Sequence, residues 1–289
     1  MSTLVCWVGV DPRGVASAYI ATDSRISFGG TDTGQIWDTG QKCYCSTLVP
    51  FIAGYVGSAF YPAHLIPRLA TYAEAIWQLH ESANDLLHSL CEFVTTALSG
   101  APENDHFGDV EMVVAFRFRN EEFTVAVIVP GRDRTGYVVK PLPIKSGVVH
   151  SCGSGASFLR RKVREWQRTH AADTSRAVYS ALCDSLLYVN PPDLGAGESP
   201  GKDPASEGPP QLVGIYRKWA GRCFGVVWKG NLYLAGIKVP RLGHEVQCRN
   251  DLFELCSPET LKPLTGAKRH RDEPTLTKRD AIRRKSRRG

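Results

Sequence analysis

The sequence predicts an α+β protein built around one large folded unit. The main evidence is the order of segments: strand-like runs, two helical stretches, more strand-like runs, two further helices and a last group of strands. The chain has 289 residues, which fits one large unit followed by a tail. Its hydrophobic content of 43% is enough to bury a core of that size.

The first half of the chain gives the clearest strand and helix signals. Apolar runs predict strands over 4–10 and 15–22, and the alternation of Cys43 and Cys45 fits one face of another strand. Residues 51–56 are apolar and end on small residues at the start of a helical stretch, 59–99.

The second half predicts a hairpin, two helices and a last group of strands. The hairpin consists of 112–116 and 123–129 around Asn120-Glu121-Glu122. The other predicted elements are strands near 138–139 and 148–149, helices over 156–170 and 174–188, and strands over 211–217, 222–228 and 231–238.

Ser2 is a candidate nucleophile. Removal of Met1 would leave a hydroxyl and a free α-amine on this one residue. An α-amine titrates at about 7.7–8.0, so part of it is unprotonated near neutral pH. It can then accept the proton of its own hydroxyl, as in N-terminal variants of the catalytic triad. Cys6 is the other nucleophile close by, but its place inside a strand favours the role of a small apolar residue.

Several short motifs follow Ser2 in a defined order. They are Asp23-Ser24-Arg25 after a strand, Lys42, Gly57-Ser58-Ala59 before a helix, Gly153-Ser154-Gly155, and Asp203-Pro204-Ala205-Ser206-Glu207-Gly208. Their order and spacing resemble proteasome β-type subunits and their bacterial relatives, which are N-terminal-nucleophile hydrolases. The resemblance implies a four-layer αββα sandwich over residues 1–265.

The resemblance also implies a role for each motif residue. Asp23 would pair with Lys42, which keeps the site electropositive, and the backbone N–H of Gly57 would stabilise the oxyanion. The residues that would orient the α-amine are Ser154, Asp203 and Ser206. Gly54 is the alternative to Gly57, and Asp184 competes with Asp203. The chain departs from the family in offering serine where the best-known relatives use threonine, and in lacking a second glycine between Ser206 and Gly208.

Charge is concentrated at the end of the chain. Residues 266–289 hold ten Lys or Arg against three Asp or Glu, a net of +7, whereas the whole chain has +6. The rest is therefore close to neutral, at about −1. We expect 266–289 to be a disordered basic tail, which an acidic partner or nucleic acid could bind.

Other patterns bear on cofactors and compartment. The histidines lack metal-ligand spacing and no Walker-type loop is present, so we expect no metal or cofactor. The nine cysteines show no zinc-type spacing and are interpreted as reduced thiols. No apolar run is long enough to cross a bilayer and no secretory signal is recognisable, which predicts a cytoplasmic protein without membrane contact.

The function predicted from the resemblance is hydrolysis of amide bonds in a peptide or protein substrate by Ser2. The family assembles into rings or larger arrays, so the resemblance also implies homo-oligomerisation. Two alternatives stay open. One is a catalytically inactive scaffold subunit that uses its basic tail to bind a partner, and the other is an amidohydrolase of the same superfamily that acts on small molecules.

Overall fold

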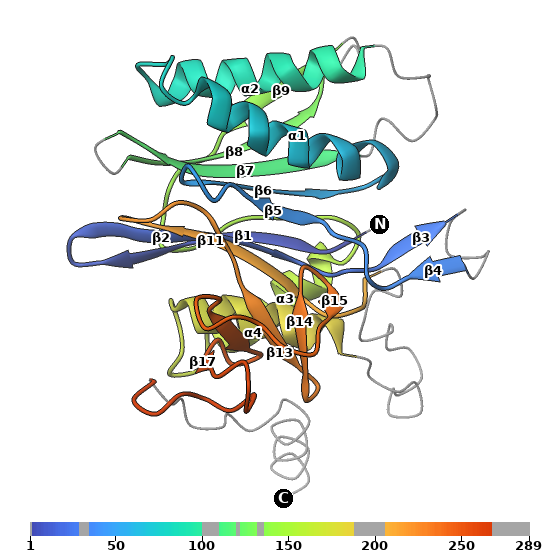
Figure 1. The fold of residues 1–289 in the computed structure, drawn as a ribbon, viewed down its shortest axis with the longest axis vertical. Coiled ribbons are helices and arrows are strands. Elements are labelled where there is room, and N and C mark those ends of the chain that lie inside the picture. Colours follow the sequence, from blue (N-terminus) through green and yellow to red (C-terminus); the bar gives the residue numbers. More distant parts are fainter. Residues whose placement is uncertain are drawn as a thin grey trace, which may run out of the picture.

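A computed structural model describes residues 2–28, 35–99, 110–119, 122–131, 136–187 and 206–267. Within these ranges the chain forms seventeen strands and four helices (Figure 1). The predicted helical stretches and most predicted strands are confirmed as elements. Asp203 and nearly all of the predicted basic tail, from residue 268 on, lie outside the described residues.

The first sheet carries the start of the chain. It is antiparallel, in the order β10-β1-β2-β11-β12. Its strands are β1 (Leu4–Asp11), β2 (Gly14–Thr22), β10 (Gly147–Cys152), β11 (Gln211–Tyr216) and β12 (Arg222–Cys223). In the register, Leu4 lies between Thr22 of β2 and Cys152 of β10, so the start of β1 is beside the ends of both neighbours.

The second sheet faces the first. It is antiparallel and its order follows the chain, β5-β6-β7-β8-β9. Its strands are β5 (Cys43–Cys45), β6 (Phe51–Val56), β7 (Glu111–Phe118), β8 (Glu122–Pro130) and β9 (Tyr137–Pro141). Leu4, Ile20 and Ile52 belong to one buried cluster that fills the space between the two sheets. This packing fixes the distance between residues at the ends of the two sheets.

Two helices cover each outer side of this pair of sheets (Figure 1). The helices α1 (Phe60–Ile76) and α2 (Ala83–Leu98) pack on the second sheet. The helices α3 (Ala156–Trp166) and α4 (Ser175–Leu186) lie on the side of the first sheet. Side-chain caps define two of the starts, because Ser82 accepts from Asp85 N at α2 and Thr174 accepts from Ala177 N at α4.

A third five-stranded sheet and a two-stranded ribbon complete the described fold. The sheet has the order β15-β14-β13-β16-β17, with one parallel pair, β13 and β16. Its strands are β13 (Gly225–Trp228), β14 (Asn231–Leu234), β15 (Ile237–Lys238), β16 (Cys248–Asn250) and β17 (Leu255–Cys256). The ribbon pairs β3 (Ile26–Phe28) with β4 (Gln35–Trp37). Val226 and Trp228 of the third sheet join the core cluster of α3 and α4.

The predicted four-layer αββα sandwich is therefore wrong for this chain. The described residues are mainly β, and seven of the seventeen strands lie outside the two main sheets. The predicted strand 222–228 is in fact two strands, because β12 ends before Phe224 and β13 joins the third sheet. Gly225 allows this change of partner, since a Cβ there would approach Cys248 Sγ to 2.6 Å.

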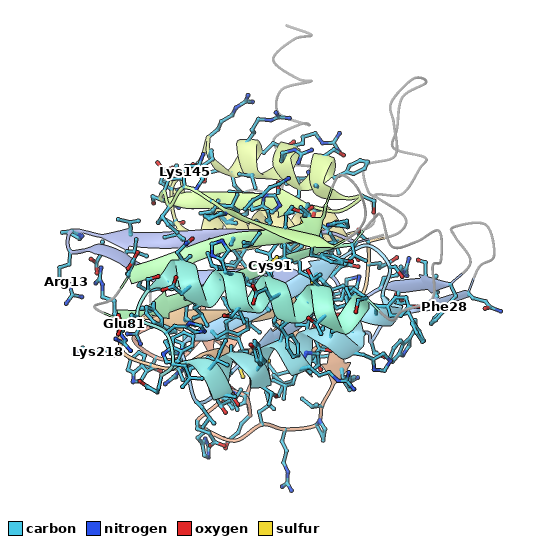
Figure 2. The ribbon with its side chains drawn as sticks, turned by 90° about the horizontal axis from the view of Figure 1, so that it is seen from above. Arg13, Phe28, Glu81, Cys91, Lys145 and Lys218 are labelled. Atoms are coloured by element: carbon cyan, nitrogen blue, oxygen red, sulfur yellow. The ribbon has the colours of Figure 1, made fainter. Side chains whose placement is uncertain are left out.

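Arg13, at the β1–β2 turn, and Phe28, at the end of β3, lie on opposite sides of the molecule (Figure 2). The predicted strands over 4–10 and 15–22 form a hairpin whose turn lies at Pro12 and Arg13, since Asp11 pairs with Gly14. In the part of the chain that the structure describes, no helix has the length and hydropathy needed to span a membrane.

Candidate active site

Antiparallel pairing brings three of the predicted site residues, Ser2, Asp23 and Ser154, to one end of the first sheet. Ser2 lies just before β1, Asp23 follows the last residue of β2, and Ser154 lies two residues after β10. Because β1 runs opposite to both neighbours, its beginning meets their ends. Lys42 comes from the facing sheet, directly before β5.

Lys42 joins Ser2 to Asp23. Its Nζ donates to Ser2 Oγ at 2.7 Å and to Asp23 Oδ2 at 3.0 Å. Lys42 and Ser2 are 1% exposed and Asp23 is fully buried. A buried ammonium group requires such a carboxylate, because an unpaired charge in the interior costs several kcal/mol. The predicted pairing of Lys42 with Asp23 is confirmed as a contact.

The Asp23 carboxylate is held from both sides by backbone N–H groups. Thr3 N donates to Oδ1 at 3.0 Å and Arg25 N donates to Oδ2 at 3.1 Å. The Thr22 hydroxyl donates to Oδ1 at 3.3 Å. These bonds fix the carboxylate orientation and so fix Lys42, which in turn points its ammonium group at the Ser2 hydroxyl.

Burial lowers the pKa of Lys42 below its ordinary value of 10.5, although the neighbouring Asp23 acts in the opposite direction. When protonated, Lys42 places a positive charge beside Ser2 Oγ, and it releases its proton more readily than an ordinary lysine does. Burial also raises the pKa of the Cys6 thiol to about 12, so Cys6 stays protonated inside β1 and is a poor nucleophile.

The lowered pKa of Lys42 predicts a pH dependence of stability. Between that pKa and 10.5, the unfolded chain keeps a proton that the folded chain has lost, so the free energy of unfolding rises with pH. We expect the difference in this free energy between the wild type and a Lys42→Met/Asp23→Asn double variant to increase as the pH rises toward 10.5. Urea unfolding at several pH values measures it, and a difference that falls or stays flat would contradict the pKa shift.

Ser154 contacts the backbone of Ser2 directly. Ser2 N donates to Ser154 Oγ at 3.1 Å, and Gly155 N donates to Ser2 O at 3.3 Å. Gly153 permits this approach, because a Cβ there would lie 2.0 Å from Ser2 O and its φ is +90°. The loop after β10 thus holds the backbone of Ser2, whereas Lys42 contacts its side chain.

Gly153→Ala should perturb the site far more than Gly147→Ala. Both glycines have positive φ, +90° and +85°, but the space around a Cβ at Gly147 is open for 4 Å. Gly147→Ala should therefore show only the conformational cost, about 1–3 kcal/mol in the free energy of unfolding. Gly153→Ala adds the clash with Ser2, so a larger loss in urea unfolding is expected. Equal losses would show that the close approach is unimportant.

The remaining predicted residues lie in different places. Ser206 is brought to the site through Thr3, whose hydroxyl donates to Ser206 Oγ at 2.8 Å. Asp203 lies outside the described residues. Asp184 is on α4 and accepts a hydrogen bond from Trp166 Nε1 at 2.8 Å. Gly54 is inside β6, paired with Cys43, whereas Gly57 lines a pocket together with Ser2.

Two side chains that support the site had no role assigned to them from the sequence: Arg25, which was named only as part of a motif, and Gln211. Arg25 forms ion pairs with Asp38, at 2.6 Å, and Glu207, at 2.8 Å, and so fastens the segment that carries Ser206. Gln211 is 1% exposed, accepts from Lys42 N at 3.0 Å and donates to Gly40 O at 2.6 Å. A polar residue at the start of an apolar strand was the available signal for Gln211.

A pocket of about 910 Å³ opens at Ser2 and Lys42. Most of its wall is apolar or aromatic, and three of these side chains are about half exposed or more: Phe28, Trp37 and Phe60. Besides Lys42, the side chains of Arg25, His64 and Glu111 supply the charged or titratable part. An apolar pocket with a few polar groups beside a candidate nucleophile suits an organic substrate.

Comparison with known proteins adds no assignment. No protein-family model matches the chain, and no curated protein matches it in sequence.

Proposed function

We propose that this protein is a hydrolase of the N-terminal-nucleophile type that cleaves amide bonds with Ser2. The observation that carries the proposal is the contact between Lys42 Nζ and Ser2 Oγ, 2.7 Å, in a buried site where Asp23 holds the lysine. Hydroxyl groups are weak nucleophiles, and a positive group beside one stabilises the alkoxide that forms when its proton leaves. A serine with no chemical role would not need a buried lysine and aspartate beside its hydroxyl.

The proposed reaction begins after Met1 is removed. The free α-amine of Ser2 accepts the proton of Oγ, and Oγ attacks the substrate carbonyl. The N–H of Gly57 stabilises the oxyanion. The proton passes from the α-amine to the departing amine as the C–N bond breaks, leaving an ester on Ser2. Water, deprotonated by the same α-amine, then hydrolyses the ester and restores the hydroxyl.

In this proposal Ser154 and Ser206 orient the reacting residue. Ser154 Oγ lies 3.1 Å from Ser2 N, which is the atom that becomes the base. Ser206 acts indirectly, because it contacts the hydroxyl of Thr3 and Thr3 follows Ser2 in the chain. Asp203 would belong to the same group.

The apolar wall of the pocket supports a peptide or protein substrate with apolar side chains. We also propose a cytoplasmic, homo-oligomeric enzyme. All nine cysteines are free thiols, which suits a reducing compartment.

The test combines intact mass with active-site labelling. We expect the purified full-length protein to have lost Met1, to cleave fluorogenic peptide amides, and to form an acyl adduct on Ser2 with a β-lactone. Retention of Met1 would contradict the proposal, because Ser2 would then have no free amine. A processed protein with neither turnover nor adduct would be the inactive scaffold, whereas an adduct without peptide cleavage would indicate a small-molecule amide as substrate.

A further inference from the structure

Three potential metal ligands converge where the end of β10 meets the start of β7, beside the pocket. They are a carboxylate, an imidazole and a thiol, on Glu111, His150 and Cys152. One ligand atom from each lies within 4.8 Å of the other two, and His150 Nε2 is 2.6 Å from Glu111 Oε1. Cys152 is buried, while the other two are about a quarter exposed.

Strand geometry explains why these side chains meet. His150 and Cys152 are two residues apart in β10 and therefore point to the same face of the first sheet. Glu111 begins β7 and shares a face with Val113, which packs in the cluster between the sheets that also contains Cys152. Each sheet thus presents its ligands to the other.

The ligand set suits zinc. Thiolate and imidazole select Zn²⁺ over Mg²⁺ or Ca²⁺, and a carboxylate is a common third ligand. A tetrahedral zinc ion keeps such ligand atoms about 3.3 to 3.6 Å apart. The His150–Glu111 contact, at 2.6 Å, would have to lengthen by about 1 Å to reach that spacing.

We propose that Glu111, His150 and Cys152 bind a zinc ion, with the fourth position left for water or for a group in the pocket. Glu111 is itself part of the pocket wall, so the site opens on the same cavity as Ser2. The ion would tie the end of β10, just before Gly153 and Ser154, to β7. The proposal does not depend on the hydrolase activity, since none of its ligands is Ser2, Lys42 or Asp23.

Cobalt and zinc titrations of the metal-free, full-length protein test this site. Co²⁺ bound by Cys152 should give a thiolate-to-metal charge-transfer band in the near ultraviolet, saturating at one ion per chain. Zn²⁺ should abolish the band by displacement and should raise the Tm. Absence of the band, or a band that Zn²⁺ leaves unchanged, would overturn the proposal.

The ligand variants should each weaken binding by at least about tenfold. Cys152→Ser should remove the charge-transfer band, and His150→Ala and Glu111→Gln should reduce cobalt affinity. His150→Ala and Glu111→Gln replace partly exposed side chains, so these two variants should fold and can test the site even if Cys152→Ser does not fold. Binding that is unchanged in all three variants would place the ion elsewhere.

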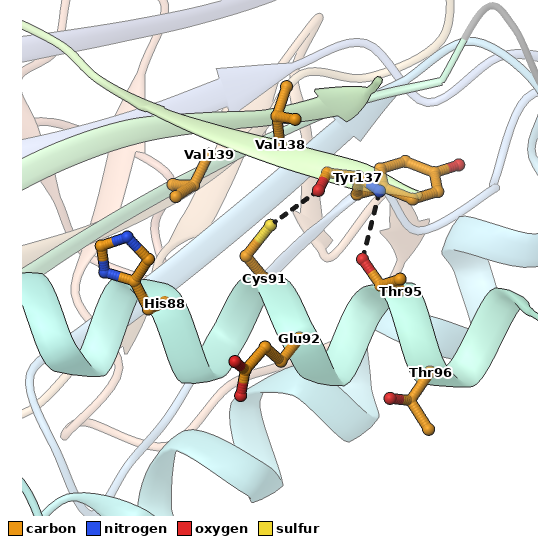
Figure 3. A pocket seen from close by; sticks show the side chains of 8 residues that line it. All are labelled: His88, Cys91, Glu92, Thr95, Thr96, Tyr137, Val138 and Val139. Carbon is orange, nitrogen blue, oxygen red and sulfur yellow. Dashed lines mark hydrogen bonds between the residues drawn. The ribbon is translucent and has the colours of Figure 1, made fainter. Parts of the chain in front are cut away.

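A hollow between α2 and β9 offers a matched control (Figure 3). It is lined by the same residue types, His88, Cys91 and Glu92, but Cys91 points toward Tyr137 and donates to its carbonyl at 3.2 Å, whereas Glu92 points away. His88→Ala and Cys91→Ser should therefore leave the cobalt spectrum and zinc affinity as in the wild type. Loss of the band in Cys91→Ser would move the site to α2 and overturn the assignment.

Discussion

Ser2→Ala is expected to lower kcat/KM for a fluorogenic peptide amide by at least about 10³-fold. The substitution removes the only atom that forms the acyl intermediate in the proposed reaction, while the α-amine and the backbone contacts to Ser154 and Gly155 remain. Oγ is small and lies in a polar environment made by Lys42, so the fold should survive. Circular dichroism and urea unfolding would check this alongside the rate.

Two controls sharpen this result. Ser58→Ala removes a hydroxyl from the same pocket without touching the Lys42 contact, so its rate should stay near that of the wild type. Ser2→Thr keeps both hydroxyl and amine and should remain active, since the extra methyl group restricts χ1. Full activity in Ser2→Ala would show that the hydrolysis has another source.

Lys42→Met is expected to have the second largest effect, on rate and stability together. It removes the positive charge 2.7 Å from Ser2 Oγ and leaves the carboxylate of Asp23 buried without its cation. Loss of one preorganised electrostatic group costs about 10²–10³ in rate. Breaking a buried ion pair from one side costs about 3–5 kcal/mol in the free energy of unfolding. Peptide turnover and urea unfolding measure the two losses.

The double variant Lys42→Met/Asp23→Asn separates these losses. With both charges gone, most of the stability should return, because an uncompensated buried charge is the main cause of the loss. The rate should stay low, since the field at Ser2 is still absent. If both the stability and the rate recovered, Lys42 would contribute to the fold alone. If neither recovered, the ion pair itself would be needed for the local structure.

Local signals predicted the elements better than their assembly. The predicted helical stretches 59–99 and 174–188 contain α2 and α4, and Ser82 and Thr174 form side-chain caps at the starts of these helices. The alternation at Cys43 and Cys45 predicted β5. The run 222–228 gave no sign that the chain would change sheets at Gly225. That change depends on Cys248, a distant residue, so no local pattern carries it.

The candidate site divides in the same way. Ser2 was predicted from its place after Met1, and Asp23 and Lys42 from the resemblance to a known family; these three residues make the central contacts. Arg25, as the clamp on Glu207, and Gln211, as the acceptor for Lys42 N, were missed because each acts on a segment far away in sequence.

The sequence by itself determined the strands β1 and β2, the four helices and the order of the reactive side chains, because periodicity and capping are local properties of a chain. Only the tertiary structure decided that the strands from Gly225 on form a third sheet, and that Glu111 meets His150 and Cys152. Which strand pairs with which, and which faces meet, depends on burial summed over distant segments.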